Sequence, residues 1–271
     1  LELHIPFTEA AIARTLAPDQ IGAWSHFHIG LQHLYRFNEG DNAEAARHFH
    51  RALELEPEFA RAHAGLSFTH WQTAFMHYGD DRVALLDRAE ATALRANDID
   101  PHDPFANYNL ARVHWLRGDI GGFSELLDRA LTLNPNFAQA SYSQALASVL
   151  TGQGETARKH AGRAMQLSPL DPLKYAMMSS YAMSLIGDGT AGEAAPLVEK
   201  ACHLPGSHFY IDMIAAAAHE LAGNEAQARA RAERARTRKP DASRQMFFSS
   251  FPFQANSARP LMDSALEKLG F

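Results

Sequence analysis

Two consecutive stretches of this chain share one length and one set of landmarks. Residues 102–135 read HDPFANYNLARVHWLRGDIGGFSELLDRALTLNP, and residues 136–169 read NFAQASYSQALASVLTGQGETARKHAGRAMQLSP. Each stretch ends on a proline that follows the previous closing proline by 34 residues, starting from Pro101. Other residue types keep the same step: Gly118 and Gly152, and Ala96, Ala130 and Ala164. A single register shared by several residue types indicates an internal repeat.

The positions of small residues predict that each repeat is a pair of packed helices. Two helices approach closely only where the facing side chains are small, with an occasional large one filling a gap. Such residues recur twelve, eight and five positions before four closing prolines: Ala45, Phe49 and Ala52; Ala89, Ala93 and Ala96; Ala157, Ala161 and Ala164; Ala228, Ala232 and Ala235. Glycines that end the first helix in a left-handed conformation are expected at Gly118, Gly152 and Gly223.

This pattern resembles the tetratricopeptide repeat (TPR), a 34-residue helix pair, from Ala23 to Pro240. The resemblance implies an all-α fold: a right-handed superhelical solenoid of about six helix pairs with a C-terminal capping helix. We expect the array at 23–240, with repeats near 23–57, 58–101, 102–135, 136–169, 170–206 and 207–240. Extra residues of the first repeat are expected in a turn at 37–42, and those of the second in a longer first helix and a turn at 75–81.

The segments outside the array are expected to act as ends of the stack. Residues 1–22 form an extension with one short helix predicted from Thr8 to Leu16, and Thr8 is its predicted N-cap. Residues 241–271 contain the aromatic run FFSSFPF at 247–253 and a predicted helix from about Arg259 to Leu269. Because a terminal repeat has an outer face without a neighbour, this aromatic segment is suited to cover the last repeat.

The resemblance also implies a concave surface lined by the first helix of each pair. Aromatic side chains and arginine dominate the corresponding positions, and these residue types commonly anchor peptide interfaces. We therefore predict a partner-binding surface at Arg61, Phe68, Trp71, Gln72, Phe105, Tyr108, Arg112, Trp115, Tyr142 and Met183. The alternative is that these side chains pack on one another or against the chain's own tail.

The two edges of the array carry a finer resemblance. Ala23-Trp24, Tyr35-Arg36-Phe37 and the run from Leu53 to Ala60 are similar to the first repeat of a bacterial group of regulators. In that group a TPR region forms the C-terminal half, and a winged-helix DNA-binding domain or a class III adenylate/guanylate cyclase domain precedes it. Phe251-Pro252-Phe253 and the ending LEKLGF resemble the C-terminus of the same group. An effector domain is therefore expected before Leu1.

Composition narrows the function classes. The net charge of −6 at pH 7 argues against nucleic-acid binding by this segment, because phosphate contacts need a basic surface. Cys202 is the single cysteine, which excludes a disulfide framework within one chain and favours a reducing compartment, so we expect a cytoplasmic protein. No apolar run approaches the ~20 residues that span a bilayer, and no membrane contact is expected.

Two clusters of polar residues leave alternatives open. Histidines gather at 26, 28 and 33 and at 48 and 50, but no carboxylate or cysteine accompanies them at a spacing suited to zinc. They are interpreted as scattered surface and packing residues, with a proton-sensing cluster as the alternative. Basic residues gather at 229–239, which indicates either a solvated helix face or a site for an anionic partner.

The sequence therefore predicts a non-catalytic scaffold that binds a protein or peptide, without cofactor or metal. Neither a phosphate-binding glycine loop nor a nucleophile elbow is present in the sequence. The leading hypothesis is the regulatory C-terminal module of a bacterial transcriptional regulator. The alternatives are the regulatory module of a nucleotide cyclase and a solenoid that senses a small molecule or a metal.

Overall fold

The computed structural model describes residue 9, residues 21–255 and residues 257–271, and these residues form α-helices without a strand. The helix predicted from Thr8 to Leu16 lies outside the described residues, apart from Glu9. The helices between residues 21 and 271 are α2 (Ala23–Leu34), α3 (Glu39–Leu55), α4 (Ala60–Met76), α5 (Arg82–Ile99), α6 (Pro104–Arg117), α7 (Ile120–Leu133), α8 (Ala138–Leu150), α9 (Gly154–Leu167), α10 (Lys174–Gly187), α11 (Ala191–Cys202), α12 (Phe209–Leu221), α13 (Glu225–Arg238), α14 (Arg244–Ser250) and α15 (Arg259–Lys268).

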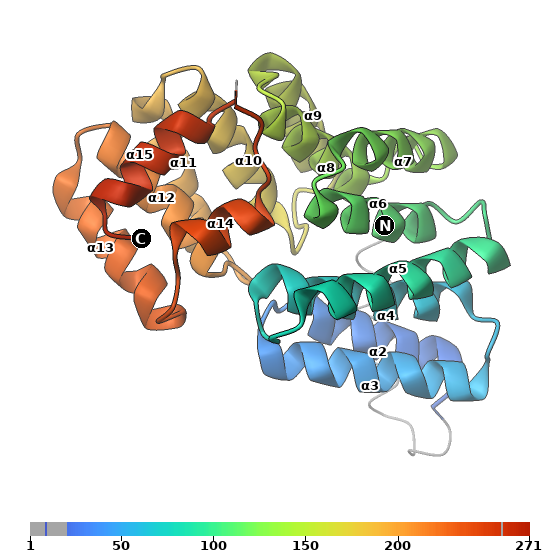
Figure 1. The fold of residues 1–271 in the computed structure, drawn as a ribbon. Helices are drawn as coiled ribbons and strands as arrows, with labels where there is room; N and C mark the ends of the chain where they lie inside the picture. The colour runs from blue at the N-terminus through green and yellow to red at the C-terminus, as the bar shows by residue number, and fades with distance from the viewer. Residues whose placement is uncertain (1–8, 10–20, 256) are drawn as a thin grey trace. The chain divides into compact units, whose positions relative to one another are not determined.

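The helices from α2 to α13 pack as six successive pairs, joined by short turns (Figure 1). Each pair is the helical hairpin that short connections favour. The closely packed positions hold the predicted small residues, since the eleven alanines predicted there and Phe49 are each at most 2% exposed. Gly118, Gly152 and Gly223 have φ of 79°, 78° and 77°. The predicted helix-pair architecture and its glycine stops are therefore confirmed.

Phe49 shows why one large residue belongs among the small ones. Its ring fills the space left by Gly30 of α2 and Gly65 of α4, and it is 0% exposed. A Cβ atom built at Gly30 would lie 2.6 Å from a ring carbon of Phe49, and one at Gly65 would lie 2.7 Å away. Three helices therefore meet closely around one aromatic ring.

The extra residues of the first two repeats lengthen helices more than turns. The turn predicted at 37–42 is shorter than expected, because α3 already begins at Glu39. The Asn38 side chain accepts a hydrogen bond from the backbone N–H of Asp41 and so caps the helix. In the second repeat α4 is 17 residues long, as predicted, but α5 is also extended, to 18 residues, whereas α6 and α7 have 14 each.

The chain divides into two compact units, residues 1–135 and 136–271. In the first unit the first helices α2, α4 and α6 pack side by side, and in the second α8, α10 and α12 do so. We call each set of three the inner row of its unit. In the second unit α15 packs on α12 and α10 (Figure 1). The predicted division into an extension, an array and a tail remains a prediction.

Candidate functional site

The predicted partner-binding residues of the first unit lie along its inner row, and most are buried. Phe68, Trp71, Gln72, Tyr108, Arg112 and Trp115 are each at most 2% exposed. Gln72 donates from Nε2 to the carbonyl of Leu34, which ties α4 to α2. In this arrangement these six side chains can contact a partner only if they move out of the interior.

Arg112 occupies the centre of this buried set. Its guanidinium carbon lies 3.5 Å from the ring centroid of Phe68 and 3.8 Å from that of Trp71. Trp71 in turn stacks on Phe75 at 4.8 Å and contacts Trp115 at 5.1 Å. Cation–π attraction is strongest where the cation is desolvated, so the cluster gives Arg112 a packing role between α4 and α6.

One end of the first inner row keeps an accessible surface. The Arg61 side chain is 45% exposed and holds the buried Asp103 carboxylate through Nε and Nη2, at 2.9 and 3.3 Å. Phe105 is half-buried. Trp24, 45% exposed, stacks on Phe59 with 6.3 Å between ring centroids. We call Trp24, Phe59, Arg61 and Phe105 the aromatic edge.

The aromatic edge combines two predicted residues with two that sequence reasoning did not assign to the site. The buried Phe27 contacts one residue of each kind: its ring centroid lies 5.3 Å from that of Phe59 and 6.4 Å from that of Phe105. The sequence could have indicated Trp24 and Phe59, because each is a large aromatic residue at the start of the first or the second repeat. Their proximity depends on the stacking of α2 on α4, which a repeat register alone does not specify.

A buried histidine lies directly behind the aromatic edge. His28 is 3% exposed, its ring lies 4.3 Å from that of Trp24, and neither ring nitrogen has a hydrogen-bond partner among the described residues. Burial, followed by the charge of Arg61, lowers the pKa of His28 to about 4. The imidazole is therefore neutral at pH 7 and supplies polar atoms within an aromatic surrounding.

In the second unit the tail, residues 241–271, covers the inner row. Phe247 and Phe251 pack on Tyr210 of α12, whose hydroxyl is 2.9 Å from the Ser250 hydroxyl. The backbone N–H of Gln254 donates to the carbonyl of Leu150 in α8 at 2.8 Å. The predicted residues Tyr142 and Met183 belong to this row and are 6% and 1% exposed. The inner row of this unit is therefore contacted by the chain's own tail.

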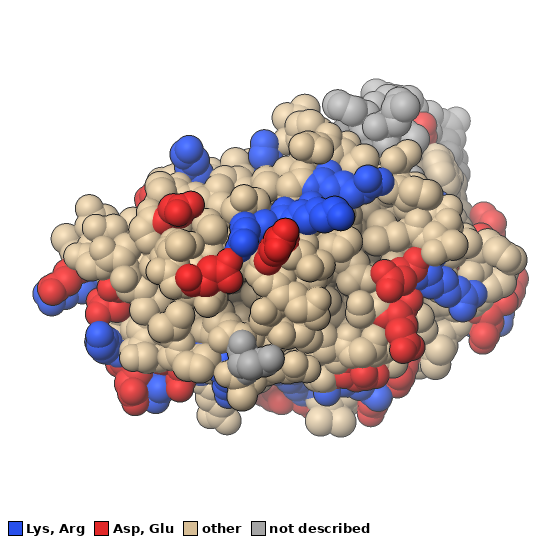
Figure 2. Space-filling view, turned by 90° about the horizontal axis from the view of Figure 1, so that it is seen from above, with Lys and Arg blue, Asp and Glu red and all other residues tan. Residues whose placement is uncertain are grey.

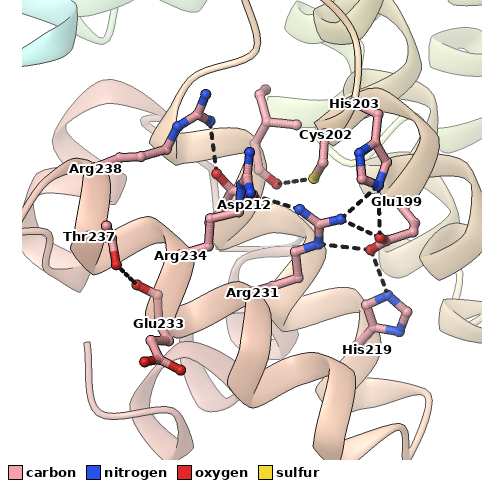
Figure 3. Close-up of polar contacts among 11 residues, drawn as sticks. Glu199, Cys202, His203, Asp212, His219, Arg231, Glu233, Arg234, Thr237 and Arg238 are labelled. Carbon is pink, nitrogen blue, oxygen red and sulfur yellow. Dashed lines mark hydrogen bonds and ion pairs between the residues drawn. The ribbon is translucent and has the colours of Figure 1, made fainter.

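Helix α13 carries the basic residues that the sequence placed on a solvated face or an anion site. Asp212 of α12 is 0% exposed, and it pairs with Arg231 at 3.0 Å, Arg238 at 2.9 Å and Arg234 at 3.6 Å (Figure 3). Arg231 also binds Glu199 of α11, and this hydrogen bond is the main reason why the pKa of Glu199 falls to about 2. The network joins three consecutive helices.

The other basic residues of this run also have partners within the chain. Arg229 pairs with Glu225, and Lys239 pairs with Asp241. Arg236 donates to the carbonyl of Leu269 and lies 4.4 Å from the ring of Phe271. Figure 2 shows a face on which several basic side chains adjoin one another, with acidic side chains beside them. Arg229, Arg234 and Arg238 are exposed, which agrees with a solvated helix face, but the sequence did not predict the ion pairs of Arg231, Arg234 and Arg238 with the buried Asp212.

Cys202 lies beside this network as a buried thiol. Its sulfur lies 3.7 Å from the carbonyl oxygen of Ile211, and burial raises its pKa to about 12 (Figure 3). Because the thiolate is the reactive form of cysteine, this side chain is held in its unreactive state.

Three histidines come together between α2 and α3. His26 and His48 face each other with 2.9 Å between their Nδ1 atoms, and the His33 ring is stacked on that of His48. Asp41 Oδ1 lies 2.5 Å from Nδ1 of His33, so one carboxylate contacts one histidine of this cluster. Within the described part of the chain, no group of three or more His, Cys, Asp or Glu side chains is arranged to hold a metal ion.

Among the helices that the structure describes, none is both long and apolar enough to cross a membrane.

Solved structures with the same fold include TPR proteins. The APC/C hetero-tetramer Cut9–Hcn1 matches with a TM-score of 0.66 at 14% identity, over 97% of this chain and 46% of that one. TTC0263, a TPR protein of Thermus thermophilus, matches with a TM-score of 0.56 at 19% identity, over 73% and 98%. PilF of Pseudomonas aeruginosa matches with a TM-score of 0.53 at 15% identity, over 83% and 94%. The fold is a TPR-type helical solenoid.

Sequence comparison gives a shorter match. A putative adenylate cyclase 3 of Rhizobium meliloti (strain 1021) is 33% identical over 87 residues, which are 32% of this chain. The match spans 15% of that relative's length. No protein-family model matches the chain.

Proposed function

We propose that this chain is a non-catalytic scaffold that binds a protein or peptide through the aromatic edge of its first unit. The observation that carries the proposal is the exposure of Trp24 and Arg61 at the end of an otherwise filled inner row. Exposed tryptophan and arginine are the residue types that contribute most to protein interfaces. The TPR-type fold supports this use, because it sets the first helices of successive pairs side by side within the unit.

The surroundings of the edge suggest the chemistry of the partner. Stacked rings of Trp24 and Phe59 provide apolar area. The Arg61 side chain is 45% exposed and bonds Asp103 through Nε and Nη2, so its remaining guanidinium N–H groups can face a partner. A segment with one large apolar residue followed by a carboxylate would match both. In the second unit the tail already occupies the inner row, so the first unit is the side on which such a segment can bind.

The test uses a peptide-display library selected on the full chain. Selected peptides should lose at least about tenfold in affinity for a Trp24→Ala/Arg61→Ala variant, since hot-spot truncations cost more than 1–2 kcal/mol. Arg95→Ala is the matched control, because Arg95 is an exposed arginine of α5 outside the edge. Selected peptides that bind the double variant as well as the parent would refute the proposed site.

The scaffold is further proposed to be the regulatory module of a larger bacterial, cytoplasmic protein. The cyclase-named relative supports a nucleotide cyclase as the attached activity. The similarity of the first repeat to that of winged-helix regulators supports a transcriptional regulator as the second candidate. Sequencing the natural gene upstream of the codon for Leu1 separates the two: a cyclase reading frame supports the first, a winged-helix frame supports the second, and neither frame refutes both.

A further inference from the structure

A shallow, open pocket of about 640 Å³ is lined by residues of the two helices of the tail. Its walls include Arg244 and Phe248 from α14, Arg259 and Asp263 from α15, and Phe271. All of these belong to the second unit. The aromatic edge, where the protein partner is proposed to bind, is not part of it.

The two arginines of the pocket differ in their partners. Arg244 is neutralised by Asp263 and Glu267, each at 3.1 Å. Arg259 forms no ion pair with the carboxylates of the described residues. Its Nη1 donates a long hydrogen bond of 3.4 Å to the carbonyl of Phe253, and its guanidinium carbon lies 4.5 Å from the ring centroid of Phe248. Arg259 is therefore a cation positioned by an aromatic ring and available to an anion.

The position of Arg259 in the fold also favours binding of an anion. It is the first residue of α15, and the cap residue Ala258 supplies no side-chain hydrogen bond. The N-terminus of a helix favours negative charge. Beside it, Phe248 and Phe271 are only partly buried and form an apolar wall. Arg259 lies over the ring of Phe248, and the ring of Phe271, which also contacts Arg236, lines the same pocket. A cation beside an apolar wall matches a molecule that joins a negative group to an apolar one.

We propose that this pocket binds a small organic carboxylate, with its carboxylate on Arg259 and its apolar part against Phe248 and Phe271. Such a ligand touches both α14 and α15 at once. It would therefore hold together the two helices of the segment that covers the inner row of the second unit. The inference goes beyond the proposed protein-binding function and does not rest on it.

The experiment measures binding of sodium phenylacetate and sodium hexanoate to the full chain by calorimetry and ligand-observed NMR. Both probes should bind at millimolar concentration or below, and the uncharged phenylacetamide should bind at least about tenfold more weakly, since charge-assisted hydrogen bonds are the stronger class. Bound phenylacetate should also raise the melting temperature, because it binds the folded chain alone.

Variants separate this site from the rest of the surface. Arg259→Gln should weaken phenylacetate binding at least about tenfold and remove the thermal shift, whereas Arg95→Gln in the first unit should match the parent. Arg259→Lys keeps the charge without the planar fork and should give an intermediate affinity, which guards against misfolding of the glutamine variant.

The proposal would be overturned by no saturable binding of either carboxylate to the folded parent, by equal binding of phenylacetamide, or by undiminished binding to folded Arg259→Gln. Phosphate that binds as tightly as phenylacetate, with no effect of Phe248→Leu on either, would also overturn it, because the apolar wall would then contribute nothing.

Discussion

At Phe49 the packing of the first unit depends on two absent side chains. The ring occupies the space that Cβ atoms of Gly30 and Gly65 would need, and α2, α3 and α4 approach one another through it. At Arg112 the close packing depends instead on a large side chain, because its guanidinium lies against the rings of Phe68 and Trp71 of α4. At both positions the size of one side chain determines the spacing of neighbouring helices.

Gly65→Ala should destabilise the protein by about 1–3 kcal/mol, because the new methyl group must displace a buried ring. Gly162→Ala is the matched control: a Cβ there meets nothing within 4 Å, and alanine is the better helix former by roughly 0.5–1 kcal/mol. Urea unfolding monitored by circular dichroism compares the two. Equal midpoints for the two variants would show that the Phe49 contact is wrong.

At the scale of the element, α13 illustrates how a strongly basic helix can be structural. Most residues of α13 are polar, and one of its arginines, Arg231, is only 8% exposed. Its charge can be buried because it forms ion pairs with Glu199 of α11 and Asp212 of α12. Removing one partner of a buried ion pair is destabilising, because it leaves an uncompensated buried charge. The network therefore explains how α13 is positioned, although alanines provide its close packing.

Arg231→Ala should cost about 3–5 kcal/mol of unfolding free energy, because it leaves the fully buried Asp212 with fewer partners and frees Glu199. Arg229→Ala, two residues away on the same helix, removes only an exposed pair and should change stability by less than about 1 kcal/mol. Thermal and urea unfolding of both variants measure the difference. A similar small effect for both would indicate that Arg231 is not buried as described.

The contribution of the tail to stability can be measured at Phe247. Phe247 is 0% exposed, and its ring lies 5.9 Å from that of Tyr210. Phe247→Ala should therefore destabilise the protein by about 3–5 kcal/mol. Leu261→Ala on α15 provides the control, since Leu261 is 38% exposed and its truncation should cost little. If unfolding of the Phe247 variant matched that of the parent, the tail would not be docked on α12.

At the scale of the whole molecule, buried and half-buried histidines couple stability to pH. Burial lowers the pKa of His28 and of His48 to about 4 and that of His208 to about 3. In the unfolded chain a histidine has a pKa of about 6.5. Between these values the unfolded chain binds more protons than the folded one, so the free energy of unfolding falls as the pH falls below about 6.5.

Urea midpoints measured at pH 7.5, 6 and 5 should therefore decrease in that order. Protonation of the Glu199 carboxylate also lowers the free energy of unfolding, but only between about pH 4.5 and 2. Measurements between pH 7.5 and 5 therefore report on the histidines and not on Glu199. His48→Gln should reduce the pH dependence, whereas replacing the exposed His102 by Gln should leave it unchanged. Midpoints that stay constant from pH 7.5 to 5 would contradict the burial of these imidazoles.

Local patterns in the sequence determined the repeat, the helix pairs and the residues that pack between them. The spacing of Pro101, Pro135 and Pro169 and of the interior alanines depends on the geometry of one helix pair, and the period repeats that geometry along the chain. Gly118, Gly152 and Gly223 follow from the same local requirement, because a helix that ends in a left-handed residue favours glycine. These features need no knowledge of distant contacts.

The tertiary structure alone decided which inner-row residues remain accessible and what the charges contact. Arg61 and Phe68 occupy equivalent kinds of positions in the sequence, but stacking against neighbouring helices leaves the first exposed and buries the second. The tail that fills the second inner row, and the pairing of Arg231 with Glu199, join residues 32 or more positions apart. Such contacts depend on how successive pairs stack, and a period of 34 residues carries no information about that angle.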